Sequence, residues 1–195
     1  MNRHLFPVLG AGLQRVSLAK GAGFATRVQT TAMLFASIGR REELKANRRR
    51  KLTTTAISWH KCCLLVAELA DKIRTRGGHH DIIVAVARGG LVPARLLSYH
   101  LEILKVTSIG ILPSKDDSHA YDLYSFPELS PNLNRILLVE DILESGGTLN
   151  HAEEVLRQAG YQVTTASLYY HSDSKVEPDI SLGANDQKIL FPWER

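Results

Sequence analysis

The sequence predicts an α/β domain with a mostly parallel, doubly wound sheet flanked by helices. Between residues 58 and 191, short apolar runs rich in Val and Ile alternate with helical patterns. Such runs are typical of strands buried on both faces of a parallel sheet. Glycine turns follow two of the runs and begin helices, so we expect both turns at the carboxyl edge of the sheet, where ligands bind in such folds.

The elements follow one another without long gaps until residue 113. Ser58 is a suitable N-cap for a helix whose apolar residues recur at helical spacing as far as Ile73, and Gly77 and Gly78 end it. The other expected elements are strand 82–87, a helix from about 92 to 101, strands 106–112 and 136–139, a turn at 140–147, a helical stripe over 149–159, and strands 163–170 and 188–191. Residues 113–134 are polar and too long for an ordinary connection, which is typical of a functional lid or a disordered insertion.

Charge divides the chain into two parts. Residues 1–51 hold eleven Lys or Arg and two acids, whereas residues 52–195 hold thirteen Lys or Arg and eighteen acids. The first part is expected to be a disordered basic extension with the composition of an organellar transit peptide, for a mitochondrion or another organelle. Initiation at Met33 is the alternative, and the protein would then be cytoplasmic. The acidic remainder argues against nucleic-acid binding, and no apolar run is long enough to span a membrane.

Residues 136–149 are the most informative segment. An apolar strand ends in the adjacent carboxylates Glu140 and Asp141, and a third acid, Glu144, precedes a turn at the start of a helix. That turn consists of Ser145, Gly146, Gly147 and Thr148. Free backbone N–H groups and the helix dipole favour a phosphate there, and the glycines allow close approach. The acids are acceptors for sugar hydroxyls or ligands for Mg²⁺.

Three further positions are candidates for ligand contacts. Arg88, before Gly89 and Gly90, has planar charged donors that can bind two phosphate oxygens at once. Trp193 has an aromatic face suited to a planar base, although a tail tryptophan also serves as a core or dimer residue. His171 directly follows the strand over 163–170.

The remaining chemical side chains indicate no site. Cys62 and Cys63 are adjacent within an apolar helical pattern, so we expect buried free thiols. The histidines without ligand spacing are expected at the surface. They are His79, His80, His119 and His151.

The segment with two acids, a third acid and a hydroxyl-Gly-Gly-Thr turn closely resembles the ribose-phosphate signature of the type I phosphoribosyltransferases. The resemblance implies that Glu140 and Asp141 hold the ribose hydroxyls, and Mg²⁺ directly or through water. It implies that the turn at 145–148 binds the 5-phosphate. Glu144 takes the position of the acid that acts on the purine nitrogen, where the family usually has Asp.

The turn at 86–93 resembles the pyrophosphate loop of bacterial and archaeal purine enzymes, a loop that often contains a non-proline cis peptide. The implied pyrophosphate ligands are Arg88, Gly89 and Gly90, with Arg88 also sharing the charge of the leaving group. The tail at 191–194 resembles that of the xanthine-guanine and archaeal hypoxanthine enzymes, in which a Trp stacks on the purine. His171 occupies the position where these enzymes usually have a Lys that bonds the 6-oxo group, and Lys175 lies four residues further on. The resemblance implies that either residue could donate to an exocyclic oxygen of the base.

The resemblance therefore implies a flexible lid, a small C-terminal hood and a homodimer. The implied reaction transfers ribose 5-phosphate from 5-phosphoribosyl-1-pyrophosphate to xanthine, guanine or hypoxanthine, with Mg²⁺ as cofactor. Two alternatives remain: a nucleotide-sensing regulator of the same fold with weak catalysis, and a transferase for another base such as orotate or adenine.

Overall fold

The computed structural model describes residues 54–114, 120–130 and 132–194. The basic extension with its expected transit segment, and residues 115–119 in the expected lid, lie outside these ranges. All described residues belong to one compact unit. Within them, no helix is both long and apolar enough to cross a membrane.

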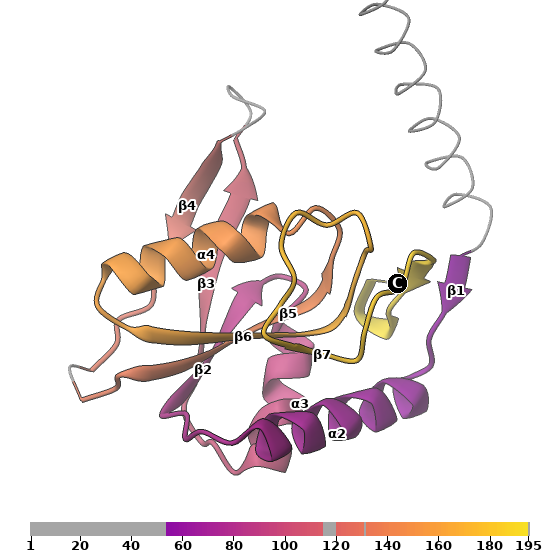
Figure 1. Ribbon diagram of the computed structural model, residues 1–195, viewed down its shortest axis with the longest axis horizontal. Helices are drawn as coiled ribbons and strands as arrows, with labels where there is room; N and C mark the ends of the chain where they lie inside the picture. The colour runs from indigo at the N-terminus through magenta and orange to yellow at the C-terminus, as the bar shows by residue number, and fades with distance from the viewer. Residues whose placement is uncertain (1–53, 115–119, 131, 195) are drawn as a thin grey trace, which may run out of the picture. The chain divides into compact units, whose positions relative to one another are not determined.

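A six-stranded sheet forms the centre of the fold (Figure 1), in the strand order β4-β3-β2-β5-β6-β7. Its strands are β2 (Ile82–Ala87), β3 (Val106–Pro113), β4 (Tyr121–Ser125), β5 (Arg135–Leu143), β6 (Gln162–Tyr170) and β7 (Ile180–Ser181). Every neighbouring pair is parallel except β3 and β4, which are antiparallel. A second sheet pairs β1 (Thr54–Ala56) with β8 (Lys188–Leu190) in parallel. The predicted fold class is confirmed.

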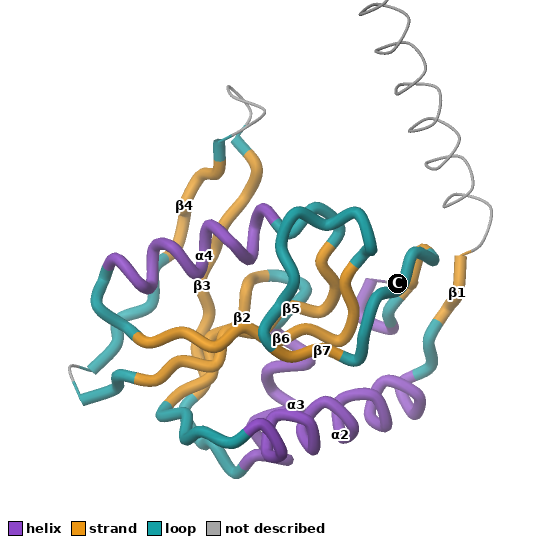
Figure 2. Tube along the Cα trace, in the orientation of Figure 1, coloured by secondary structure: helices purple, strands orange, loops and turns teal. Residues whose placement is uncertain are grey.

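Helices cover both faces of the main sheet. They are α2 (Trp59–Arg76), α3 (Leu91–Leu101) and α4 (Gly147–Gln158), and a 3-10 turn, η1 (Pro192–Glu194), ends the described chain. Helices α2 and α3 lie on one face and α4 lies on the other (Figure 2). Ser58 caps α2 as predicted, because its Oγ accepts a hydrogen bond from the backbone N–H of Lys61 at 3.2 Å.

Strand alternation divides the core into two layers. In β2, Ile83 and Ala85 pack with α2 and α3, whereas Val84 and Val86 pack with α4. All four residues are buried, which explains why this strand is apolar throughout instead of alternating. The same division applies to β5, where Val139 faces α2 and α3.

Three sequence expectations need correction. Glu140 and Asp141, expected in the turn at 140–147, lie within β5, which continues to Leu143 and pairs with β6, whereas Glu144 follows the strand. Part of the polar segment at 113–134 is β4, an edge strand with no buried residue. The strand expected at 188–191 is β8, which pairs with β1 and not with the main sheet.

Two expectations about burial, for His80 and Cys63, also differ from the structure. His80 is buried, and this burial lowers the pKa of its imidazole. Cys62 is buried as expected, but Cys63 is exposed, because the two residues point in different directions on α2. Burial raises the pKa of the Cys62 thiol to about 11, so it is protonated at neutral pH.

Candidate active site

A cavity of about 930 Å³ opens at the carboxyl edge of the sheet, where β2 and β5 end. It brings together the two glycine turns, the acids and the C-terminal tail. The predicted site residues that line it are Arg88, Gly89, Glu140, Asp141, Glu144, Ser145, Gly146, Gly147, Thr148 and Trp193. Its volume lies in the range typical of small-molecule sites.

Glu140 and Asp141 point to opposite faces of β5. Side chains alternate along a strand, so Asp141 follows Val139 toward the α2–α3 face and Glu140 points toward α4. Both carboxyls nevertheless line the cavity, because the strand ends between the two layers. Burial, and then the charge of Asp141, raise the pKa of Glu140 well above its usual range.

Asp141 is held on three sides. One carboxylate oxygen, Oδ1, accepts the backbone N–H of Ile142 at 2.7 Å, and Oδ2 accepts the indole N–H of Trp193 at 3.0 Å. A β-carbon at Gly89 would lie 2.5 Å from Oδ1, so the first glycine turn packs directly on this carboxylate. Only 7% of the residue is exposed, and burial raises its pKa while the hydrogen bonds from Trp193 and Ile142 lower it.

Two helix N-termini with glycine at the N-cap face the cavity. Helices α3 and α4 have Gly90 and Gly146 as N-caps, so neither cap residue has a side chain that accepts a hydrogen bond, and no acid occupies either first turn. The first N–H of each helix already has a partner, because Leu91 donates to the carbonyl of Arg88 at 3.2 Å and Gly147 donates to Oγ of Ser145 at 3.4 Å. The N-terminus of α2, by contrast, is capped by Ser58. The remaining N–H groups and the positive end of the helix dipole make both turns suitable for anions.

Close packing explains the glycines of the second turn. Gly146 has a φ of 77°, a left-handed conformation that glycine adopts without steric cost. A β-carbon at Gly147 would lie 2.5 Å from Cζ of Tyr121, which leaves no room for a side chain. Backbone N–H groups can therefore approach a ligand directly at this turn.

The first turn contains the cis peptide that the resemblance implied, between Ala87 and Arg88. Arg88 is exposed and lines the cavity, and within the described ranges it forms no ion pair. Gly90 is buried and does not line the cavity. A β-carbon there would overlap the carbonyl oxygen of Val139 and lie 2.9 Å from that of Val86.

Trp193 packs between Phe191 of the tail and Trp59 at the start of α2. Its ring stacks on Phe191 with centroids 4.6 Å apart and an interplanar angle of 7°, and Trp59 approaches it at 6.0 Å and 53°. The indole edge, which donates to Asp141, faces the cavity. These contacts correspond to the expected core role of this residue, and the expected stacking on a base stays a prediction.

His171 is not among the residues that line the cavity. It is buried, its backbone N–H donates to the carbonyl of Leu143 at 2.8 Å, and its Nδ1 has no hydrogen-bond partner among the described residues. Glu144, by contrast, is exposed at the cavity wall. The predicted base contact of His171 would require its loop to move.

Comparison with known proteins identifies the family. Residues 57–193 match the model of the phosphoribosyl transferase domain. The chain belongs to this family. A xanthine-guanine phosphoribosyltransferase of Gluconobacter oxydans is 26% identical over 143 residues, which cover 71% of this chain and 83% of that protein.

Solved phosphoribosyltransferases share the fold. The xanthine-guanine-hypoxanthine phosphoribosyltransferase of Helicobacter pylori superposes with a TM-score of 0.65 at 25% identity, covering 72% of this chain and 93% of that one. A purine phosphoribosyltransferase from Pyrococcus horikoshii gives a TM-score of 0.65 at 26% identity, with coverage of 73% and 95%.

The charges of this phosphoribosyltransferase site fit a divalent cation brought by a substrate. The ionisable carboxyls at the cavity are Glu140, Asp141, Glu144 and Glu194, against the single guanidinium of Arg88. No cluster of three or more His, Cys, Asp or Glu suited to a metal occurs in the described parts of the chain. Mg²⁺ is usually held by one or two carboxylates together with substrate phosphates, so the donor set fits that arrangement.

Sequence reasoning missed two residues of the phosphoribosyltransferase cavity. Tyr121 reaches it from β4, and Glu194 reaches it from η1. Tyr121 lies 26 positions from Gly147 in the sequence, and its strand has no buried face that would give an alternating apolar pattern. Glu194 was visible only as part of the tail at 191–194.

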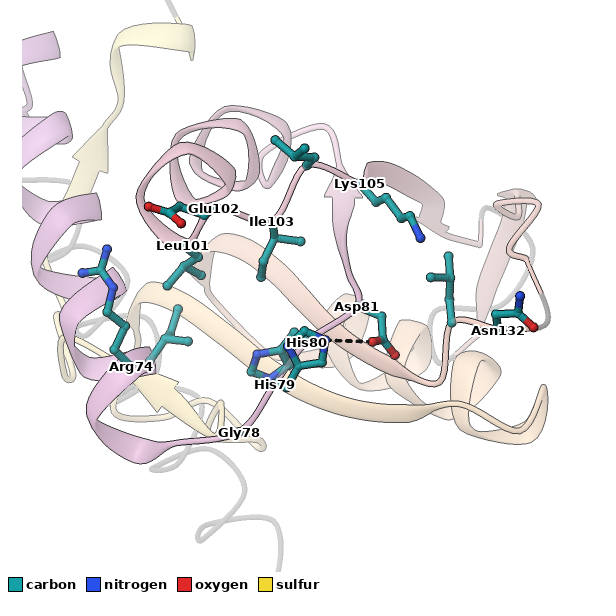
Figure 3. Close-up of a pocket in the computed structure, with 13 residues that line it drawn as sticks. Arg74, Gly78, His79, His80, Asp81, Leu101, Glu102, Ile103, Lys105 and Asn132 are labelled. Carbon is teal, nitrogen blue, oxygen red and sulfur yellow. Dashed lines mark ion pairs between the residues drawn. The ribbon is translucent and has the colours of Figure 1, made fainter.

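A second cavity, of about 440 Å³, lies at the opposite edge of the sheet, where β2, β3 and β5 begin (Figure 3). Its main polar group, Asp81, already has structural partners: Oδ2 accepts the N–H groups of Asn134 and Arg135 at 2.9 Å each, and Oδ1 pairs with His79 at 3.1 Å. These contacts join β2 to β5. Within the described ranges, none of the predicted ligand-binding residues lines this second cavity.

Proposed function

We propose that this phosphoribosyltransferase transfers ribose 5-phosphate from 5-phosphoribosyl-1-pyrophosphate to xanthine, guanine or hypoxanthine in purine salvage, and releases pyrophosphate. One observation carries the proposal: two helix N-termini with glycine N-caps border the same cavity as an acid pair and a tail tryptophan. Two anion sites separated by hydroxyl acceptors match a sugar that is phosphorylated at both ends. The names of the bacterial relatives support a 6-oxopurine as the acceptor.

In this proposal the turn at 145–148 binds the 5-phosphate through the N-terminus of α4. Glu140 and Asp141 accept hydrogen bonds from the ribose hydroxyls. Arg88, with the backbone of Gly89 and Gly90, binds the pyrophosphate, and its guanidinium stabilises the negative charge that develops as the pyrophosphate leaves.

The acids also have an electrostatic role. Positive charge builds on the ribose ring as the bond at C1 breaks, and ionised Glu140 and Asp141 beneath the ring would stabilise that charge. Mg²⁺, when bound with the substrate near these carboxylates, would supply charge neutralisation for the pyrophosphate. Glu144 holds or accepts the proton at the purine nitrogen, from its exposed position on the cavity wall.

The base is proposed to lie against the tail. Trp193 offers an indole surface at the cavity, and the family resemblance of residues 191–194 supports stacking on a purine. His171 is proposed to donate to the 6-oxo group only after its loop has moved, because it is buried and does not line the cavity. The lid at 113–134 and the C-terminal hood remain predictions of the same kind.

The test is a substrate panel. Purified full-length protein is incubated with 5-phosphoribosyl-1-pyrophosphate and Mg²⁺ and with each of xanthine, guanine, hypoxanthine, adenine and orotate separately, and pyrophosphate release is followed. Turnover with a 6-oxopurine supports the proposal. Turnover with adenine or orotate alone would replace the substrate assignment but keep the reaction class.

A second candidate function is a nucleotide sensor of the same fold. Two observations favour it: Glu144 stands where the family usually has Asp, and His171 is buried where a base-contacting Lys is usual. An extra methylene moves a carboxylate by roughly 1 Å, which can cost about 10²-fold in rate. Tight binding of a purine nucleotide without turnover of any base would establish the sensor.

We further propose a homodimer. Large apolar side chains remain exposed on α3, where Leu91 is 45% and Tyr99 is 75% exposed. Exposed apolar residues of this size are common at interfaces between copies of a chain. Light scattering of the purified protein measures the assembly directly.

The basic segment at 1–51 is proposed to direct the protein to an organelle. Its surplus of Lys and Arg supports this address. A fluorescent reporter carrying residues 1–51 would mark the mitochondrion or another organelle. A diffuse cytoplasmic signal from that fusion would remove the proposal.

A further inference from the structure

Tyr121 is the first residue of β4, and it joins the cavity from a strand that has no other residue there. β4 pairs antiparallel with β3, so that Tyr121 lies opposite Pro113 at the end of the ladder. Pro113 and Leu112 of β3 also line the cavity. The hairpin therefore brings this tyrosine against the turn at 145–148, which follows β5 in the sequence.

The hydroxyl of Tyr121 reaches the first residue of α4. A β-carbon built on Gly147 would overlap this hydroxyl oxygen, and Cζ would be 2.5 Å away. The oxygen therefore occupies the volume that any side chain at position 147 would need. Glycine at this position permits two things at once, access of a ligand to the backbone and the approach of this hydroxyl.

His151 holds the ring in that position. Residues 147 and 151 lie one helical turn apart on the same face of α4, so a side chain lying along this face touches both. The rings of Tyr121 and His151 are stacked, with centroids 5.7 Å apart and an interplanar angle of 23°. The stack restricts the ring before any ligand binds, which lowers the entropy lost on binding.

The chemistry at this point favours an anion. A phenol donates one hydrogen bond, and a donor beside the N-terminus of α4 adds to the same anion site. Ser145 and Thr148 supply hydroxyls on the same turn. Among the acidic residues that line the cavity, Glu144 is nearest in sequence to this turn, and its side chain is exposed to solvent.

We propose that Tyr121 is a further phosphate-binding residue, contributed by β4, whose hydroxyl donates to the phosphate held at the start of α4. The inference rests on the proposed function, because it takes the ligand to be a sugar 5-phosphate. It adds a consequence: a bound phosphate links the β3–β4 hairpin to α4.

Tyr121→Phe tests the proposal, because it keeps the ring and its stack on His151 and removes only the hydroxyl. Isothermal titration calorimetry would measure binding of ribose 5-phosphate, guanosine 5′-monophosphate and guanosine to the full chain. Loss of a hydrogen bond to a charged phosphate should weaken both phosphorylated ligands by about tenfold or more. Guanosine, which has no phosphate, should bind equally well to both proteins.

Tyr124→Phe is the matched control on the same strand. Tyr124 packs over Gly110, is 56% exposed and does not line the cavity. Tyr124→Phe removes a different phenol hydroxyl from β4, and the affinities for all three ligands should stay within twofold of those of the unsubstituted protein. Thermal melting of both variants shows whether each is folded.

The possible outcomes separate this inference from the proposed function. Unchanged or tighter phosphate binding by Tyr121→Phe overturns the inference, and so does an equal loss of guanosine affinity. If the unsubstituted enzyme meanwhile releases pyrophosphate with a 6-oxopurine, the proposed function stands alone. Failure of the unsubstituted protein to bind either phosphorylated ligand overturns both.

Discussion

The hydrogen bond between Trp193 and Asp141 allows a quantitative test of how the tail supports the acids. Trp193→Phe keeps an aromatic ring on Phe191 and removes the indole N–H that lies 3.0 Å from Oδ2 of Asp141. Since only 7% of Asp141 is exposed, water replaces that donor poorly. The carboxylate would keep backbone donors, chiefly the N–H of Ile142, but would lose its side-chain donor.

The size of the effect follows from these contacts. A hydrogen bond to a charged group contributes about 1.5–3 kcal/mol, so we expect a loss of about 2 kcal/mol in the free energy of unfolding at pH 8. For a chain of this size that corresponds to a decrease of roughly 4–8 °C in Tm. Urea unfolding and thermal melting without added Mg²⁺ would measure both quantities.

The loss should depend on pH. Burial raises the pKa of Asp141 in the folded state, so ionised Asp141 destabilises the fold at pH values above its ordinary pKa, and the bond from Trp193 offsets part of that cost. Removing the donor therefore matters most where the carboxyl is ionised. As the pH falls through the folded pKa, the carboxyl becomes protonated in the folded state and the deficit should shrink by half or more.

Trp59→Phe is the matched control. Trp59 also touches the Trp193 ring, but it is 54% exposed, so the substitution should change stability by less than about 0.5 kcal/mol. A deficit for Trp193→Phe that is equally large at pH 8 and pH 4 would refute the role of the hydrogen bond. So would a deficit no larger than that of the control.

Three further predictions concern the glycine turn, the acid pair and the arginine. Gly90→Ala keeps a permitted backbone (φ −66°, ψ −13°) but forces its β-carbon into the carbonyl oxygen of Val139. The substitution should therefore lower the free energy of unfolding by about 3 kcal/mol. A urea midpoint equal to that of the unsubstituted protein would contradict this prediction. Glu140→Gln removes a carboxylate whose pKa is raised by burial and by Asp141, so stability at pH 8 should rise by on the order of 1 kcal/mol while kcat/KM falls. The gain in stability should vanish near pH 4, where the carboxyl is protonated in both the folded and the unfolded state. Thermal melting at the two pH values tests this prediction. Arg88→Ala should lower kcat/KM for the sugar diphosphate by about 10²-fold. Tm should change little, because the side chain of Arg88 is exposed. A change of less than threefold in the pyrophosphate-release assay would exclude Arg88 from catalysis.

Local patterns were sufficient where a residue's neighbours in sequence determine its environment. The apolar run of β2 and the Ser58 cap of α2 were predicted correctly because burial on both faces and capping leave clear marks in the sequence. The predicted end of β5, at Val139, was wrong, because a strand with charged residues near its end resembles a turn in sequence. Pairing with β6 continues through Glu140 and keeps the acids in the sheet.

The edge strand β4 shows the limit of pattern reading. Its residues are partly or fully exposed, so the sequence lacks the alternation of apolar and polar side chains that identifies a half-buried strand. Antiparallel pairing with β3 stabilises it, and that pairing depends on the turn of the chain between the two strands. His80 was assigned to the surface for a related reason, because nothing in the sequence shows that neighbouring elements cover it.

The sequence by itself determined the order of β2, β3, β5, β6 and the three helices, the acids toward the end of one strand and the glycine turns that begin two helices. These features depend on hydrogen bonds and burial within a few residues of each other. Tertiary structure alone decided that the indole of Trp193 meets Asp141, that the hydroxyl of Tyr121 meets Gly147, and that His171 is buried and does not line the cavity. The first two contacts join residues 52 and 26 positions apart, and their geometry depends on strand order and on the packing of layers, which no local periodicity encodes.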